Sequence, residues 1–137
     1  MSNRNLYKLA EQEGIVILTW DFVPPADGIY YYECGIPPII GIANRIQEDS
    51  VLYRCVLAEE LGHHFTTTKN ALPPKYQNIR EKIKVGRAEF QARRWAAQYL
   101  MPLDRVIESL QGGTCQSWEL AQEFGVTEEL VNLRMEL

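Results

Sequence analysis

The hydrophobic periodicity of the chain changes at Asp49, and this change constrains the fold more than any other feature. Before Asp49, short apolar runs rich in β-branched and aromatic residues alternate with turns containing Pro and Gly, which predicts strands at residues 15–20, 28–34 and 39–43. After it, apolar residues recur every three to four positions, which predicts helices at 50–65, 79–99, 103–110 and from 117 onward. A small sheet followed by helices is an α+β fold.

The flanking segments complete this outline. Leu6, Leu9 and Ala10 stand at helical spacing, so a short helix is predicted at residues 3–13. The polar stretch 66–77 predicts a loop. Three strands in quick succession predict a meander, and Pro37 and Pro38 favour an edge position for the strand beside them.

Length and charge limit the organisation and the partners. The chain has 137 residues, 46% of them hydrophobic, which suits a single globular domain over residues 1–137 with a helical C-terminal part at about 103–137. Its formal net charge of −4 gives no general attraction to nucleic acid or to anionic membranes. Residues 1–8 contain no apolar run of the kind a signal peptide needs, and the apolar stretches are too short to cross a bilayer, so we expect a cytoplasmic protein.

The helix predicted at residues 50–65 carries polar side chains where apolar ones are expected. Leu52, Cys55 and Val56 define its apolar stripe by their spacing. Seven and eleven residues after Leu52, the same stripe reaches Glu59 and His63, and Glu60 stands at its rim. Asp49 is placed to cap the N-terminus of this helix.

The helix predicted at residues 79–99 shows the same anomaly, because Glu89 falls inside a stripe formed by Val85, Ala88, Ala92, Ala96 and Tyr99. Burying two carboxylates and an imidazole is costly unless something compensates them. A shared divalent cation does so. Glu59, His63 and Glu89 would supply three ligands, and a fourth position open to water is typical of a catalytic metal site. Glu60 would then act as general base.

A structural interpretation of the same residues stays open. Glu59 and Glu89 could pair with nearby arginines, which are Arg54, Arg87, Arg93 and Arg94, although the wheel turns Arg93 and Arg94 away from the Glu89 stripe. His63 could be a structural histidine. His64 lies 100° further round the helix, which predicts a supporting or surface role.

These segments resemble the ImmA/IrrE family of metallopeptidases, whose pattern is a helix with L-A-H-E-L-G-H and, later, a glutamate six residues before F-A-A-E-L-L-M-P. Residues 57–63 read L-A-E-E-L-G-H here, and residues 95–102 read W-A-A-Q-Y-L-M-P, with Glu89 six residues before Trp95. The resemblance implies a minimal zincin-like domain in which His63 and Glu89 bind the metal and Glu60 is the base. The first histidine of the family pattern is replaced by Glu59.

The resemblance also implies a cofactor and an activity. Zn²⁺ is expected, but two anionic ligands leave the ion less able to polarise a bound water and shift the preference towards Mn²⁺ or Fe²⁺. We therefore expect a slow metallo-endopeptidase with a variant E-E-x-x-H motif. The alternative is a metal-free pseudo-protease that binds the same partner without cutting it.

The partner that the resemblance implies is a helix-turn-helix repressor of a phage or other mobile element, with this chain acting as an anti-repressor. By analogy with zincins, an edge strand would hold the substrate, and Ile40, Gly41 and Ile42 are the candidates; a plain core strand is the alternative. The segment from residue 117 has the cadence of a helix-turn-helix with Leu120, Ala121, Phe124, Val126 and Leu130 as its core. Its many glutamates disfavour direct nucleic-acid binding.

Overall fold

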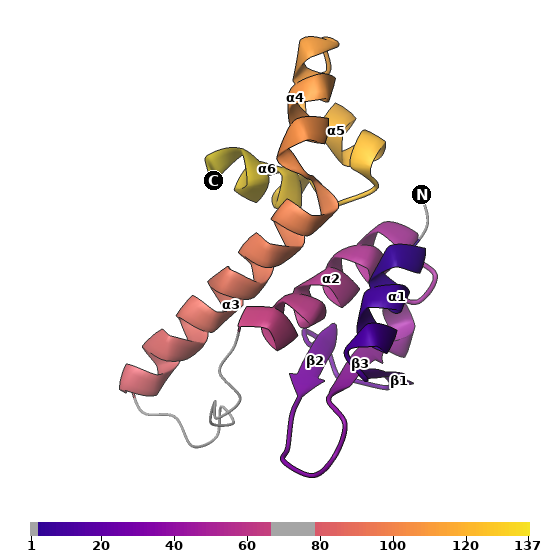
Figure 1. Ribbon diagram of the computed structural model, residues 1–137, viewed down its shortest axis with the longest axis vertical. Helices are drawn as coiled ribbons and strands as arrows, with labels where there is room; N and C mark the ends of the chain where they lie inside the picture. The colour runs from indigo at the N-terminus through magenta and orange to yellow at the C-terminus, as the bar shows by residue number, and fades with distance from the viewer. Residues whose placement is uncertain (1–2, 67–78) are drawn as a thin grey trace.

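A computed structural model describes residues 3–66 and 79–137, with the side chains of the second part described from residue 86. The predicted loop at 66–77 therefore lies, apart from Thr66, outside the described residues. The strands are β1 (Val16–Trp20), β2 (Gly28–Tyr31) and β3 (Ile39–Ala43), followed by a short 3₁₀ helix, η1 (Asn44–Ile46). The helices are α1 (Arg4–Gln12), α2 (Ser50–Thr66), α3 (Ile79–Leu100), α4 (Leu103–Gln111), α5 (Ser117–Phe124) and α6 (Glu128–Glu136). The α+β class predicted from the sequence is confirmed (Figure 1).

The order of the strands differs from the predicted meander. β3 lies in the centre, parallel to β1 and antiparallel to β2, so the order is β1-β3-β2. The register pairs Leu18 of β1 with Gly41 of β3, and Gly41 with Ile29 of β2. The edge position predicted for residues 39–43 is wrong: Pro37 and Pro38 precede the strand, and the carbonyl oxygen of Pro38 still accepts a hydrogen bond of 2.9 Å from the backbone N–H of Val16 at the start of β1.

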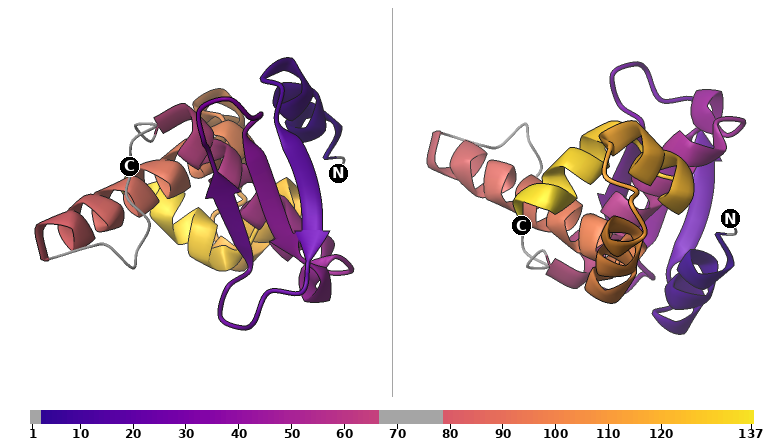
Figure 2. Two further views of the ribbon diagram at one scale, coloured as in Figure 1. Left: turned by 90° about the horizontal axis from the view of Figure 1, so that it is seen from below. Right: turned by 90° about the horizontal axis from the view of Figure 1, so that it is seen from above.

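Helix α2 lies between the sheet and α3, and this position explains its composition. It contacts β2 and β3 on one side and α3 on the other, and Figure 2 shows the strands on one side of the molecule with the helices behind them. Leu57 and Leu61 are fully buried within this arrangement. The opposite face of the sheet is exposed, as at Leu18 and Trp20. A helix that is covered on two sides has no single apolar stripe.

The start of α2 is capped as predicted. The Asp49 carboxylate accepts a hydrogen bond of 3.0 Å from the backbone N–H of Leu52, which satisfies one of the unpaired donors of the first turn.

Asp49→Ala should lower the free energy of unfolding by about 1 kcal/mol, measured by chemical denaturation. Glu48→Ala, which changes the exposed residue before it, is the control and should have almost no effect. Equal losses in both variants would contradict the capping role.

The C-terminal helices form a second core with the end of α3. Cys55 of α2 and Met101 are buried in it, and so are all five residues of the predicted helix-turn-helix core: Leu120, Ala121, Phe124, Val126 and Leu130. Gly125, in the left-handed conformation at φ 66°, ends α5 and turns the chain towards α6. Among the described residues, no helix combines the length and apolar character needed to span a membrane.

Candidate active site

The backbones of α2 and α3 approach each other closely at Gly62. A Cβ atom added there would stand 2.3 Å from the carbonyl oxygen of Ala92, so glycine is required for the two backbones to meet. The helices run in opposite directions, since Glu59 lies opposite Arg93 and His63 opposite Glu89. A glycine in this motif allows either a backbone or a ligand to approach closely, and the group that approaches Gly62 is the backbone of α3.

His63 and Glu89 meet across the two helices. The distance from Nε2 of His63 to Oε1 of Glu89 is 3.1 Å. The hydrogen bond from His63 lowers the pKa of Glu89. Burial by itself would lower the pKa of His63, but the bond to Glu89 and the neighbouring carboxylates outweigh it and raise that pKa. Glu89 is not buried as its stripe position predicts, since its side chain is 58% exposed.

Glu60 is the most buried carboxylate of the group. Its residue is 9% exposed, and its Cγ lies 3.4 Å from the position that a Cβ atom on Gly28 of β2 would occupy. Burial raises the pKa of Glu60 to about 7, against a partial opposing effect of His63. A carboxyl group with a pKa near neutrality can take up a proton and release it at physiological pH, as a general base requires.

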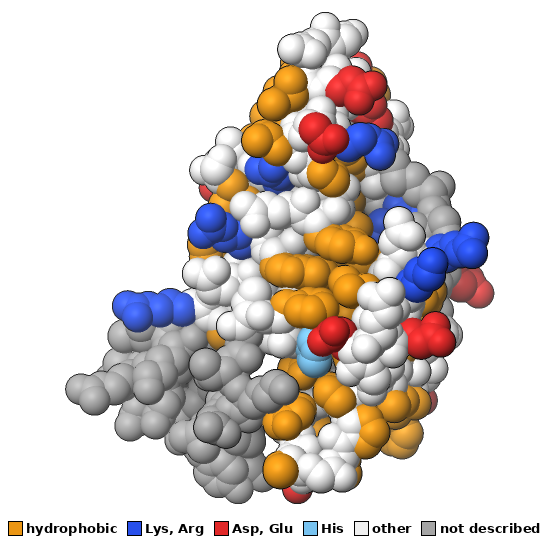
Figure 3. All heavy atoms as spheres, in the orientation of Figure 1, with side chains coloured by type: hydrophobic (Ala, Val, Ile, Leu, Met, Phe, Trp, Pro, Cys, Tyr) orange, Lys and Arg blue, Asp and Glu red, His pale blue; other side chains and the backbone are white. Residues whose placement is uncertain are grey.

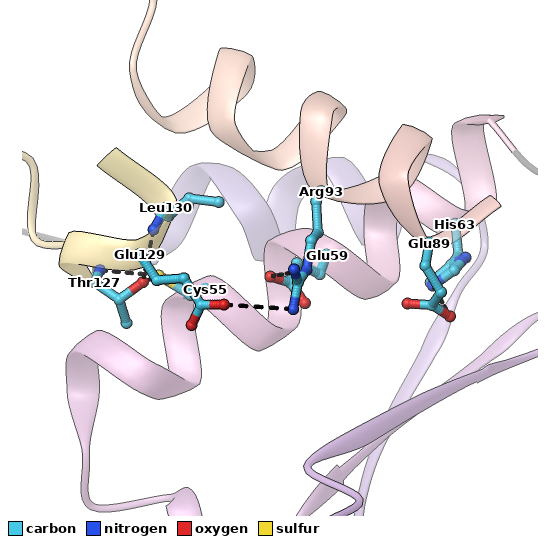
Figure 4. Close-up of polar contacts among 8 residues, drawn as sticks. All are labelled: Cys55, Glu59, His63, Glu89, Arg93, Thr127, Glu129 and Leu130. Carbon is cyan, nitrogen blue, oxygen red and sulfur yellow. Dashed lines mark hydrogen bonds and ion pairs between the residues drawn. The ribbon is translucent and has the colours of Figure 1, made fainter. Parts of the chain in front are cut away.

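Glu59 points away from β2, towards α3 and α6. Its Oε1 lies 3.8 Å from Nε of Arg93, and another nitrogen of the same guanidinium lies 3.7 Å from Oε1 of Glu129 on α6. Figure 4 shows Glu59 and Arg93 turned towards each other, with His63 and Glu89 further along the two helices. Burial raises the pKa of Glu59, and Arg93 partly opposes that rise.

Arg93 therefore faces α2, and the helical-wheel prediction that it points away from the Glu89 stripe is wrong. Arg93 stands four residues after Glu89, so the two side chains leave α3 on the same side. That spacing is visible in the sequence and is the signal that identifies Arg93. The ion pair with Glu59 follows because α2 and α3 are antiparallel, which the sequence does not specify.

Of the two roles predicted for His64, the structure favours the supporting one. Its Nε2 lies 2.9 Å from a carboxylate oxygen of Glu13, and its Nδ1 lies 2.8 Å from the hydroxyl of Tyr30. A carboxylate accepts hydrogen bonds, so Nε2 donates to Glu13 and Nδ1 accepts from Tyr30. His64 thus joins α2 to the end of α1 and to β2. Both ring nitrogens of His64 are engaged in these contacts. His63 is therefore the histidine that is placed to bind a ligand.

The strand beside the site is β2, not β3. Ile40 and Ile42 are fully buried, and β3 is hydrogen-bonded on both sides, so Ile40, Gly41 and Ile42 have no free backbone edge to offer a substrate. This corrects the substrate-binding role expected for them. β2 pairs with β3 along one side, is an outer strand of the described sheet, and passes over Glu60 at Gly28.

An open cavity of about 540 Å³ lies among α2, α3 and α6. Glu59, Glu89 and Arg93 line it together with side chains of α6, among them Glu129 and the apolar Leu130 and Leu133. On the face shown in Figure 3, hydrophobic side chains gather in a central band. Glu59, Glu89 and Arg93 are therefore accessible from this cavity, whereas Glu60 is buried.

Of the three side chains predicted to bind a divalent cation, two have donor atoms at a suitable separation. Two ligands of one tetrahedral zinc ion lie about 3.3 Å apart, and His63 Nε2 and Glu89 Oε1 lie 3.1 Å apart. Glu59, the third expected ligand, is paired with Arg93 instead. Among the side chains that the structure describes, no three His, Cys, Asp or Glu residues converge on one point.

A small α+β domain in which a Glu-x-x-His helix faces a glutamate on the following helix has the arrangement of a zincin-like metallopeptidase domain. The profile of the IrrE N-terminal-like domain, Peptidase_M78, matches residues 10–136. The chain therefore belongs to this peptidase family, and the resemblance inferred from the two motifs is confirmed. No curated protein and no solved structure gives a significant match.

Proposed function

We propose that this protein is a metal-dependent endopeptidase of low intrinsic activity. The observation that carries the proposal is Glu60, a buried carboxyl group with a pKa near 7, held beside the His63–Glu89 pair in a member of a peptidase family. Its role would be to accept a proton from the attacking water and to return it to the leaving amine. His63 and Glu89 would hold the ion, and Glu59 would complete the set after leaving Arg93. Zn²⁺, Mn²⁺ or Fe²⁺ bound there would polarise the scissile carbonyl and the water.

The substrate strand would lie along β2. The outer edge of β2 is the nearest strand edge to Glu60, since Gly28 packs against that side chain. An extended peptide that added to this edge would pass the Glu60–His63 side of α2. For the identity of the substrate we propose a helix-turn-helix repressor of a phage or mobile element, on the basis of the family resemblance and its expected cytoplasmic location.

The first test is Glu59→His, which restores the histidine of the family pattern. A neutral imidazole has no attraction to Arg93, and it leaves more positive charge on a bound ion. Zn²⁺ affinity, measured by competition with a chromogenic chelator, and cleavage of a repressor encoded beside this protein, followed by mass spectrometry, should each rise about tenfold. The matched control is Glu59→Gln, which also breaks the ion pair but supplies no imidazole. Equal or lower activity in Glu59→His would contradict the proposal.

A second function is supported by the Glu59–Arg93 pair. If Glu59 stays with Arg93, two ligands remain, and the protein would bind the repressor without cutting it. Purified protein supplied with each metal in turn separates the two functions. Stoichiometric metal together with cleavage that ends on chelation supports the enzyme. Repressor binding of the same strength with and without a chelator, and no fragments, supports the binder.

A further inference from the structure

The guanidinium of Arg93 lies between two carboxylates from different parts of the fold. Glu59 belongs to α2, next to the candidate base, and Glu129 belongs to the first turn of α6. The two N···O distances, 3.8 and 3.7 Å, are nearly equal, so Arg93 is shared between the two partners. The Arg93 side chain is 49% exposed, and each pair is therefore weak enough to exchange.

The position of Glu129 is set by a contact between α6 and α2. The backbone N–H of Thr127 donates a hydrogen bond to the thiol sulfur of Cys55, at 3.5 Å, and the Thr127 side chain caps α6 by accepting from the N–H of Leu130. Cys55 stands one turn before Glu59 on the same side of α2. The start of α6 is thus held beside Arg93, as Figure 4 shows.

Resting on the proposed function, we propose that Arg93 is a positioning residue that holds Glu59 away from the metal ligands, and that α6 weakens this hold through Glu129. While Glu59 pairs with Arg93, His63 and Glu89 are the two ligands that face each other. When Arg93 turns to Glu129, the Glu59 carboxylate is released and can join them. The placement of α6 would then set the affinity of the site for a divalent cation.

The test measures binding of Zn²⁺ and Mn²⁺ alone, by chelator competition, without any substrate. Arg93→Gln should bind each metal about two- to fivefold more tightly, the range expected for the loss of an exposed ion pair. Glu129→Gln should bind about two- to fivefold more weakly, because Arg93 then remains with Glu59. Both side chains are exposed, so both variants should fold.

The controls separate this exchange from a general effect of charge. Arg94→Gln and Glu128→Gln remove the same charges one residue away, at exposed positions, without changing the Arg93 pairs, and should shift affinity less. In a Glu59→Gln background the effect of Arg93→Gln should disappear, because the residue on which Arg93 acts has lost its charge. An effect of undiminished size in that background would overturn the proposal, as would equal shifts in the control variants.

The same affinity measurements distinguish the role of Arg93 from the endopeptidase activity. Metal that binds wild type and Arg93→Gln with equal affinity overturns the role of Arg93 and leaves the endopeptidase proposal standing. Absence of metal binding by wild type, Arg93→Gln and Glu59→His alike overturns both.

Discussion

Glu60→Gln should abolish peptide cleavage and, at the same time, stabilise the metal-free fold at pH 8. The amide cannot accept the proton of an attacking water, so cleavage should fall about 10²- to 10⁴-fold. The stabilisation follows from burial, which raises the pKa of Glu60 in the folded protein to about 7 from its ordinary value of 4.5. Glutamine has nearly the same shape and no charge to bury.

The sign of the pH dependence follows from this raised pKa. Below about pH 4.5 the carboxyl group is protonated in both the folded and the unfolded chain, and its buried form carries no charge. As the pH rises towards 7, the unfolded chain releases the proton while the folded chain retains it, so stability is lost progressively. Above pH 7 the loss is complete and amounts to about 3 kcal/mol.

The measurement is chemical denaturation at pH 5 and pH 8 with a chelator present. The gain in free energy of unfolding for Glu60→Gln over wild type should be small at pH 5 and should approach about 3 kcal/mol at pH 8. Glu108→Gln, on the exposed side of α4, is the matched control and should show no such trend. A variant that is less stable than wild type at both pH values would show that the Glu60 side chain is not held as a buried, desolvated carboxyl group.

Gly62→Ala should cost about 3 kcal/mol of stability, in spite of the better helix propensity of alanine. The added methyl group would meet the carbonyl oxygen of Ala92 at 2.3 Å and its carbonyl carbon at 2.9 Å. Both are backbone atoms of α3, which cannot turn aside as a flexible side chain does. The helices must separate, and the contact between His63 and Glu89 must lengthen with them.

Gly86→Ala is a control with the opposite expected sign. Gly86 is also a helical glycine, and a Cβ atom there would have no neighbour within 4 Å. This variant should gain up to about 1 kcal/mol from helix propensity. Urea denaturation of the two variants side by side measures both effects. A neutral or stabilising Gly62→Ala would show that α2 and α3 do not approach as closely as the structure places them.

The positions of the helices, and the polar residues that they present, were largely predictable from the sequence. Helix caps and side-chain spacing involve residues that are close together along the chain. The cap by Asp49 and the one-turn spacing between Glu59 and His63 depend on neighbours within a few positions. The meeting of His63 with Glu89 was also anticipated, since two polar side chains on apolar stripes required partners. The burial of these residues was not predicted correctly. Glu89 is mostly exposed, whereas Glu60, expected at a rim, is almost completely buried.

The sequence by itself determined the α+β class, the strand at 39–43, the extents of α2 and α3 to within a residue or two, and membership of the IrrE-like peptidase family. These depend on periodicity, caps and motif spacing, which act over short distances along the chain. The tertiary structure decided the central place of β3, the burial of Glu60 between α2 and β2, and the pairing of Glu59 with Arg93. Those features depend on contacts between segments far apart in the sequence. Whether Glu59 faces Arg93 or the His63–Glu89 pair is settled by how α2, α3 and α6 pack together.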